Sequence, residues 1–168
     1  MAQGRPEGDF REIRRSAPRR PSDGGSGGET HAQRCHREGH RTAVKSIPGI
    51  GPTLGSVLVA EIGEQHQVRS APNLTCWAGL TPKHHESDTH VHRGRITKEG
   101  SRLVRRAAIE SVKNIPAGSV VGLLRERVAD RRGRNIGSVA AARRQLEFVF
   151  YALRDGHVRA LEHQPRVA

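Results

Sequence analysis

Aromatic side chains are scarce in this sequence, at 3% of 168 residues, so stacking platforms for single-stranded nucleic acid are poorly supplied. Cysteine is scarce too, because Cys35 and Cys76 form no CxxC pair and indicate no disulfide framework. No apolar run approaches the roughly 20 residues that a membrane-spanning helix needs. The first residues lack the apolar core of a signal peptide. We therefore expect a cytoplasmic protein with no membrane partner.

Acidic residues are outnumbered by basic ones. The chain has 29 Lys and Arg against 17 Asp and Glu, which gives a formal net charge of +12. Such an excess favours a polyanionic partner, and nucleic acid is the first candidate. With few aromatic residues, contact with phosphates is the expected basis of binding.

Large apolar residues are nearly absent from the first 45 residues, which are rich in Arg, Gly, Ser and Pro. A segment of this composition buries too little apolar surface to offset the entropy lost on ordering. We therefore predict a disordered basic, Gly-rich segment over 1–45, an ordered domain over 46–161 and a tail over 162–168.

The ordered part shows helical rather than alternating periodicity, and the fold class that we predict is mostly α. Leu103, Val104 and Ile136 are among the apolar residues that we expect to be buried. The polar stretch Thr81–Thr97 reads as a catalytic-type loop, with a short hairpin around Arg93-Gly94. The expected helices cover about 52–62, 71–80, 98–114, 120–130 and 135–155.

A glycine-rich turn, IPGIG at 47–51, precedes the first of these expected helices. Glycines let backbone N–H groups approach a phosphate, and a helix N-terminus adds partial positive charge. The turn is therefore typical of a helix-hairpin-helix that contacts DNA through Gly49 and Gly51. The other interpretation is a tight loop that only packs two helices. The segment 36–46, where the preceding helix of the motif would lie, has little apolar content.

Four histidines, His84, His85, His90 and His92, crowd the polar stretch and raise the possibility of a zinc site with Cys76. Zinc ligands usually come in separated pairs at fixed short spacings. Histidines gathered in one polar loop do not follow that pattern, so we expect no metal site.

Ser87 lies among these histidines and is a candidate nucleophile. A serine hydroxyl needs a base to take its proton and positive groups around the developing phosphorane. The polar stretch thus has three interpretations, namely a zinc site, the pocket of a nucleophile, and a basic DNA-contact loop without chemistry. Composition alone favours the third. Candidate proton acceptors and phosphate clamps are His85, Glu86, Asp88, His90, Arg93, Arg95, Lys98 and Arg102.

Three stretches together resemble the C-terminal domain of transposases of the insertion sequence 110/116/902 family. They are WAGLTP at 77–82, ESD at 86–88 and RGRITKEGSRLVR at 93–105. The IPGIG turn upstream and RGRN at 132–135, before a long helix, are also typical of that family. The resemblance covers about 46–161.

The resemblance implies an RNA-guided transposase in which Ser87 attacks a phosphodiester and forms a transient covalent link. It implies DNA and a guide RNA as partners, a homo-oligomer, and Mg²⁺ held by four acidic residues of an N-terminal RuvC-like domain. The DNA-binding residues that we predict are Gly49, Gly51, Arg93, Arg95, Lys98, Arg102, Arg105 and Arg106.

The sequence departs from the family pattern in two places. Asp88 stands where family members usually have glycine after the serine. The first 45 residues hold no apolar strand that could carry the Mg²⁺ ligands, so the ligands implied by the family are absent from this chain. We therefore expect a truncated transposase that is inactive alone. The alternative is a non-catalytic basic module that binds DNA or RNA.

Overall fold

The computed structural model describes residues 31–63, 68–87 and 90–162, and within these the side chains of 31–33, 35, 84–87, 90–93 and 162 are not described. The elements are α2 (His31–Lys45), α3 (Pro52–Ile62), α4 (Ala71–Trp77), β1 (Pro82–Ser87), β2 (His90–Ile96), α5 (Arg102–Lys113), α6 (Val120–Arg132), α7 (Arg134–Asp155) and α8 (Arg159–Glu162). The described part is mostly helical, as predicted. No helix in it is long and apolar enough to cross a membrane.

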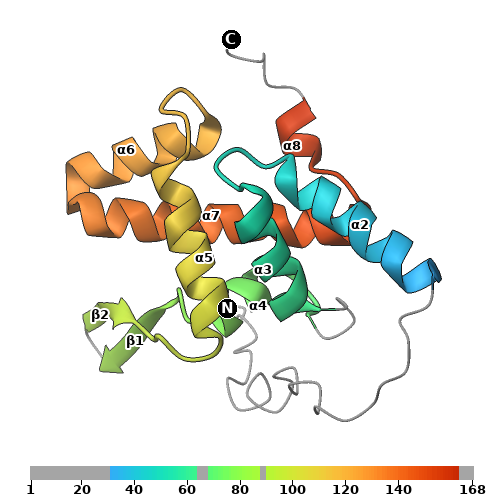
Figure 1. Ribbon diagram of the computed structural model, residues 1–168. Helices are drawn as coiled ribbons and strands as arrows, with labels where there is room; N and C mark the ends of the chain where they lie inside the picture. The colour runs from blue at the N-terminus through green and yellow to red at the C-terminus, as the bar shows by residue number, and fades with distance from the viewer. Residues whose placement is uncertain (1–30, 64–67, 88–89, 163–168) are drawn as a thin grey trace, which may run out of the picture.

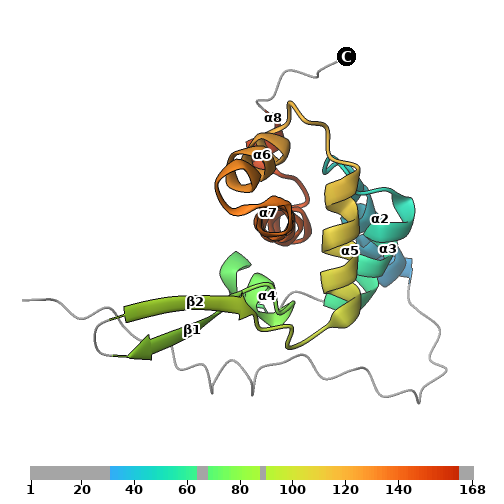
Figure 2. The same cartoon turned by 90° about the vertical axis from the view of Figure 1, so that its left-hand side faces the viewer.

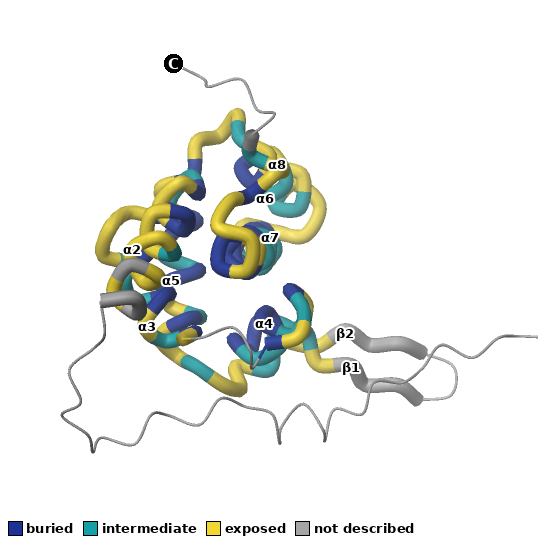
Figure 3. Tube along the Cα trace, turned by 90° about the vertical axis from the view of Figure 1, so that its right-hand side faces the viewer, coloured by how far each residue is buried: buried dark blue, intermediate teal, exposed yellow. Residues whose placement is uncertain are grey.

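Helix α7 is the centre of the helical body (Figure 1), and it contacts α2, α4, α5 and α6. Leu146 and Val149 of α7 are fully buried, and the tube of α7 is dark blue where the other helices surround it (Figure 3). Gly137 lets α6 approach closely, since a Cβ there would lie 2.7 Å from the carbonyl oxygen of Arg125. The apolar stripe of one long helix therefore organises the core.

Helix α3 follows the sequence prediction closely. Pro52 occupies its first turn and Gly63, at a φ of 64°, ends it. Leu58 and Ile62 are buried, and their spacing of four residues places them on one face of the helix. Serines begin three of the later helices, because the side chains of Ser70, Ser101 and Ser119 accept hydrogen bonds from the first-turn amides of α4, α5 and α6.

Helix α2 covers 31–45, which is the last part of the segment predicted to be disordered. Among the described side chains of α2, those of the last turn enter the core, where Ala43 is 6% exposed and Val44 fully buried. The side chain of Arg41 also donates to Ser56 Oγ on α3 at 2.9 Å. Tertiary contacts at one end stabilise this helix, so it can form without an extended apolar stripe in its sequence. Residues 1–30 and 163–168 lie outside the described residues. The disorder predicted for 1–30 and the tail predicted over 162–168 therefore stay predictions.

The stretch 81–97 is a two-stranded antiparallel hairpin rather than a loop. Ser87 pairs with His90, so the connection lies at 88–89 and not at Arg93-Gly94, and Gly94 falls within β2. In Figure 2 the hairpin extends away from the helices. A strand pair that is not packed on a core needs no apolar alternation, which explains why the sequence pattern did not reveal it.

Two apolar residues expected in the core are instead on the surface. Leu103 is 51% exposed and Ile136 is 50% exposed. Each lies near the start of its helix, one position away from the buried stripe. Ser111 takes a buried position on α5 and donates its hydroxyl to the carbonyl oxygen of Ala108 at 2.8 Å.

Candidate functional site

The base of the hairpin is formed by two chain segments that lie about 20 residues apart in the sequence, 78–81 and 97–100. The amide of Thr97 donates to the carbonyl oxygen of Thr81 at 2.9 Å, and the amide of Lys98 donates to that of Gly79 at 3.0 Å. The stretches WAGLTP and ITKEGS therefore form one structural unit.

Two glycines allow these segments to approach. Gly79 has a φ of 68°, and a Cβ there would lie 2.2 Å from the carbonyl oxygen of Glu99. Gly100 has a φ of 82°, and a Cβ there would lie 1.7 Å from the carbonyl oxygen of Trp77. Both the backbone conformation and the contact exclude a side chain. Trp77 itself is half-buried and packs against the core.

Arg105 of α5 fixes this unit to the helical body. Its Nη1 donates to the carbonyl oxygen of Ala78 at 2.9 Å and to that of Glu99 at 3.4 Å. Ser101 adds a second attachment, because its hydroxyl donates to Glu61 Oε2 on α3 at 2.9 Å while accepting from the amide of Val104 at 3.2 Å. The predicted phosphate ligand Arg105 thus also holds the hairpin base in place.

Four of the other predicted phosphate ligands run in one continuous segment from the end of β2 into α5. Arg95, Lys98, Arg102 and Arg106 are all exposed, so their charges face solvent. Lys98 has a positive φ of 56°, which is uncommon for a residue with a side chain. The side chain of Arg93 lies outside the described residues.

Ser87 ends β1 at the tip of the hairpin. The tip is far along the hairpin from its attachment to the helices (Figure 2), and its side chains lie outside the described residues. The fold therefore places the candidate nucleophile on a projection and the exposed cations at the base of the same projection.

The two predicted phosphate glycines have different surroundings. Gly49 has a φ of 88° and packs inward, since a Cβ there would lie 2.5 Å from the carbonyl oxygen of Ser111. Gln145 of α7 donates from Nε2 to the carbonyl oxygen of Pro48 at 2.8 Å, which ties the turn to the core. Gly51 is exposed and precedes the first turn of α3, with open space where a Cβ would lie. The turn therefore packs helices at Gly49, while Gly51 remains accessible.

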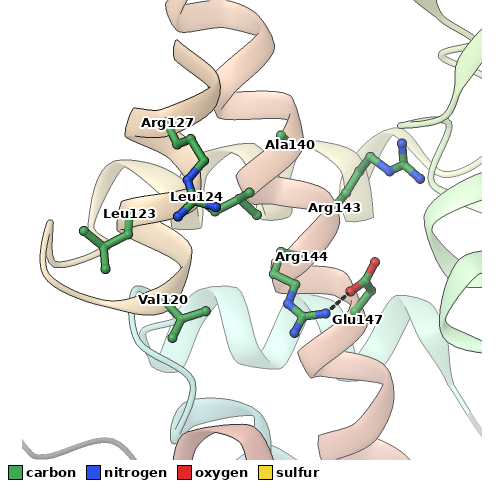
Figure 4. A pocket seen from close by; sticks show the side chains of 8 residues that line it. All are labelled: Val120, Leu123, Leu124, Arg127, Ala140, Arg143, Arg144 and Glu147. Atoms are coloured by element: carbon green, nitrogen blue, oxygen red, sulfur yellow. Dashed lines mark hydrogen bonds and ion pairs between the residues drawn. The ribbon is translucent and has the colours of Figure 1, made fainter. Parts of the chain in front are cut away.

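Sequence reasoning missed Gln145, which is 1% exposed. The signal that could have revealed it is a polar residue within the apolar stripe of α7. It also missed a groove of about 660 Å³ between α6 and α7 (Figure 4). Its lining combines apolar and charged side chains, namely Val120, Leu123, Leu124, Arg127, Ala140, Arg143, Arg144 and Glu147.

The described side chains offer no group of three His, Cys, Asp or Glu residues that could hold a metal ion. Cys76 is half-buried and free. The Mg²⁺ implied by the resemblance therefore finds no matching set of ligands among these side chains.

Comparison with protein families matches residues 41–115 to the transposase IS116/IS110/IS902 family. This segment runs from the last turn of α2 to the end of α5 and includes the whole hairpin.

Several curated relatives are similar to parts of this chain. A transposase for insertion sequence element IS1111A from Coxiella burnetii is 29% identical over 117 residues, which cover 66% of this chain and 32% of the relative. A putative transposase, y4pF/y4sB, from Sinorhizobium fredii is 36% identical over 59 residues, which cover 35% of this chain and 15% of the relative. A pilin gene-inverting protein from Moraxella bovis is 45% identical over 56 residues, 32% of this chain and 17% of that protein.

The chain spans about a third or less of the length of these relatives. The family match and the relatives agree with the resemblance that the motifs at 77–82 and 93–105 carry. Residues 41–115, with the hairpin and the helices that hold its base, are therefore the part of this chain that matches the IS116/IS110/IS902 transposase family.

Proposed function

We propose that this chain is a DNA-binding unit of a transposase and that Ser87 is its nucleophile in DNA strand transfer. The observation that carries the proposal is the family match over 41–115, which includes the hairpin that ends β1 at Ser87. A relative named for gene inversion and others named as transposases support recombination as the broader activity.

The proposed step is a transesterification. Ser87 Oγ forms a bond to phosphorus while its hydroxyl proton passes to a base. The bond between phosphorus and one DNA oxygen breaks, and that oxygen takes up a proton and leaves as a hydroxyl. Attack by a different DNA hydroxyl on the phosphoserine reverses the process, restores Ser87 and joins the new strands. The phosphoserine link retains the bond energy, so the exchange needs no external energy source.

The cations at the hairpin base would hold the DNA backbone for this step. Exposed Arg95, Lys98, Arg102 and Arg106 lie along one segment and can neutralise neighbouring phosphates. Arg93 and Arg105 belong to the same proposed set, with Arg105 donating one nitrogen to the backbone at the hairpin base. Gly51 at the start of α3 would add a backbone contact, with Gly49 shaping the turn.

Mg²⁺ is not used in any part of this proposal, because the described side chains do not form a group that fits it. Guide RNA, oligomerisation and a cytoplasmic location stay predictions of the resemblance and the composition. The second candidate function is a nucleic-acid-binding module without chemistry, which the net charge of +12 favours.

Trapping of a covalent intermediate tests the nucleophile. Because the chain is expected to be inactive alone, it is incubated together with the N-terminal RuvC-like domain that the resemblance implies and with DNA from the junctions that flank its coding sequence. Adducts are then separated under denaturing conditions. We expect an adduct with the unsubstituted chain, its loss in Ser87→Ala and its retention in Ser138→Ala, a serine on α7.

An adduct of equal yield in Ser87→Ala would show that another residue is the nucleophile. If DNA binds but no variant forms an adduct, the non-catalytic module is the better account. Tighter binding to structured RNA than to DNA would favour a guide-RNA contact over a DNA contact.

A further inference from the structure

The hairpin register sorts the four histidines of the 84–92 stretch onto two faces. His85 pairs with His92, and Ser87 pairs with His90. Because alternate positions of a strand belong to opposite faces, these two pairs share one face. The pair Glu86–Val91 lies between them in register, the pair His84–Arg93 lies next to His85–His92 on the side of the hairpin base, and both share the other face. Three of the histidines therefore belong to the face of Ser87, and His84 does not.

This placement has the spacing of a metal site. Directly opposed residues of an antiparallel pair have Cβ atoms about 4.5–5.5 Å apart, and diagonal neighbours about 7–8 Å apart. His85 and His92 are opposed, and His90 lies two residues from His92 on the same strand. Three imidazoles with one open position form a familiar zinc coordination set.

We infer that the hairpin face shared by His85, His90 and His92 binds one transition-metal ion of the zinc class. Imidazole is a ligand that suits zinc, copper and nickel ions, in contrast to the carboxylates that Mg²⁺ needs. The inference uses only the register of the hairpin and does not depend on the proposed strand transfer.

The expectation of no metal site assumed that the histidines lie in one polar loop. In a loop, adjacent His84 and His85 compete for one ion and no pair is fixed by the backbone. In the hairpin, strand pairing separates His84 from His85 and brings together residues seven positions apart, His85 and His92. Strand pairing therefore fixes which histidine positions are neighbours, which their spacing in the sequence does not.

A second histidine pair must be separated from this site in any binding measurement. His36 and His40 lie four residues apart on α2, with ring centroids 4.0 Å apart. Burial, and then the neighbouring His36, lower the pKa of His40, which favours its neutral, metal-binding form. Two ligands make an incomplete set, but the pair can hold a metal ion weakly.

The test measures Zn²⁺ binding to the full chain by calorimetry and Co²⁺ binding by its visible absorption. All variants carry His36→Ala and His40→Ala, which removes the α2 pair. We expect one equivalent of metal to bind and the affinity to fall about tenfold or more in each of His85→Ala, His90→Ala and His92→Ala. His84→Ala, which removes the adjacent histidine on the other face, should leave the affinity within about twofold.

Two further measurements complete the test. Binding should weaken as the pH falls from 7.5 to about 5.5, because protonated imidazole does not bind metal. Thermal unfolding of each variant without metal should match that of the His36→Ala, His40→Ala parent, since the hairpin tip is remote from the core. A shift in unfolding would be checked with His→Gln variants, which must also lose binding.

Several results would overturn the inference. They are an equal loss in His84→Ala, unchanged affinity in His85→Ala and His92→Ala, or no binding once the α2 pair is removed. Ser87→Ala should keep full metal affinity while losing the DNA adduct, so failure of the metal site and failure of the nucleophile are separate outcomes.

Discussion

Gly100 is a position of the ITKEGS stretch at which a side chain does not fit. Its φ of 82° and the 1.7 Å that would separate a Cβ from the carbonyl oxygen of Trp77 combine two obstacles to substitution. We expect Gly100→Ala to lower the free energy of unfolding by about 3 kcal/mol or more, from backbone strain together with overpacking. Urea unfolding of the full chain measures this.

Gly156 provides the matched control. Its φ of 74° is similar, but nothing lies within 4 Å of the place where a Cβ would be. Gly156→Ala should therefore cost only the backbone strain, about 1–2 kcal/mol. Equal losses in the two variants would show that the contact with Trp77 has no influence on stability.

Helix α5 and the hairpin are linked by the guanidinium of Arg105. Its bonds to the carbonyl oxygens of Ala78 and Glu99 join the helix to both segments of the hairpin base. We expect Arg105→Ala to reduce the free energy of unfolding by about 1–2 kcal/mol, since these bonds are charge-assisted and half-exposed. Chemical unfolding checks the value.

Arg102→Ala is the control on the same helix, because Arg102 is exposed at its first turn. A change within about 0.5 kcal/mol is expected there. If Arg105→Ala leaves stability unchanged while weakening DNA binding, its role is phosphate contact alone.

The elements differ in how far the sequence could reveal them. Helix α3 was predictable, since Pro52, the apolar face and Gly63 mark its start, its buried side and its end. Helix α2 was not, because only its last turn around Val44 is buried and local sequence carries no information about that docking. The hairpin was not, because strand pairing between polar segments depends on the attachment of its base, which is a tertiary contact.

Residue types offered the candidate site as one of three interpretations of the polar stretch, and the family resemblance selected it. The stretch at 86–88 indicated Ser87 and the motif at 93–105 indicated the cations, but neither showed that the motifs at 77–82 and 93–105 pack on one another. The close approach at Gly79 and the second role of Arg105 needed coordinates, because neither follows from residue type or spacing.

Across the whole molecule, the net charge of +12 predicts salt-sensitive binding to nucleic acid. The slope of log affinity against log salt should become shallower by about 0.9 for each phosphate contact removed. We expect this change in Arg102→Gln and in Arg106→Gln, measured by fluorescence anisotropy with duplex DNA.

Lys113→Gln is the control for net charge, because it removes one positive charge at the other end of α5. Lys113 is exposed and pairs with Glu110 at 2.9 Å. We expect its slope to equal that of the unsubstituted chain. A reduction as large as that of Arg102→Gln would mean that overall charge, and not the hairpin base, determines binding.

The hydrogen bond between Thr97 and Thr81 closes the base of the hairpin, so the polypeptide leaves the helical body and returns to it at nearly the same point. Residues 82–96 are thus a detachable cassette, because the scaffold needs only that its two ends meet. Mutation can lengthen, shorten or replace the part between 83 and 95 without disturbing the core, whereas Ile96 packs against it. A scaffold of this kind allows the hairpin to vary in length while the helices that hold its base stay the same.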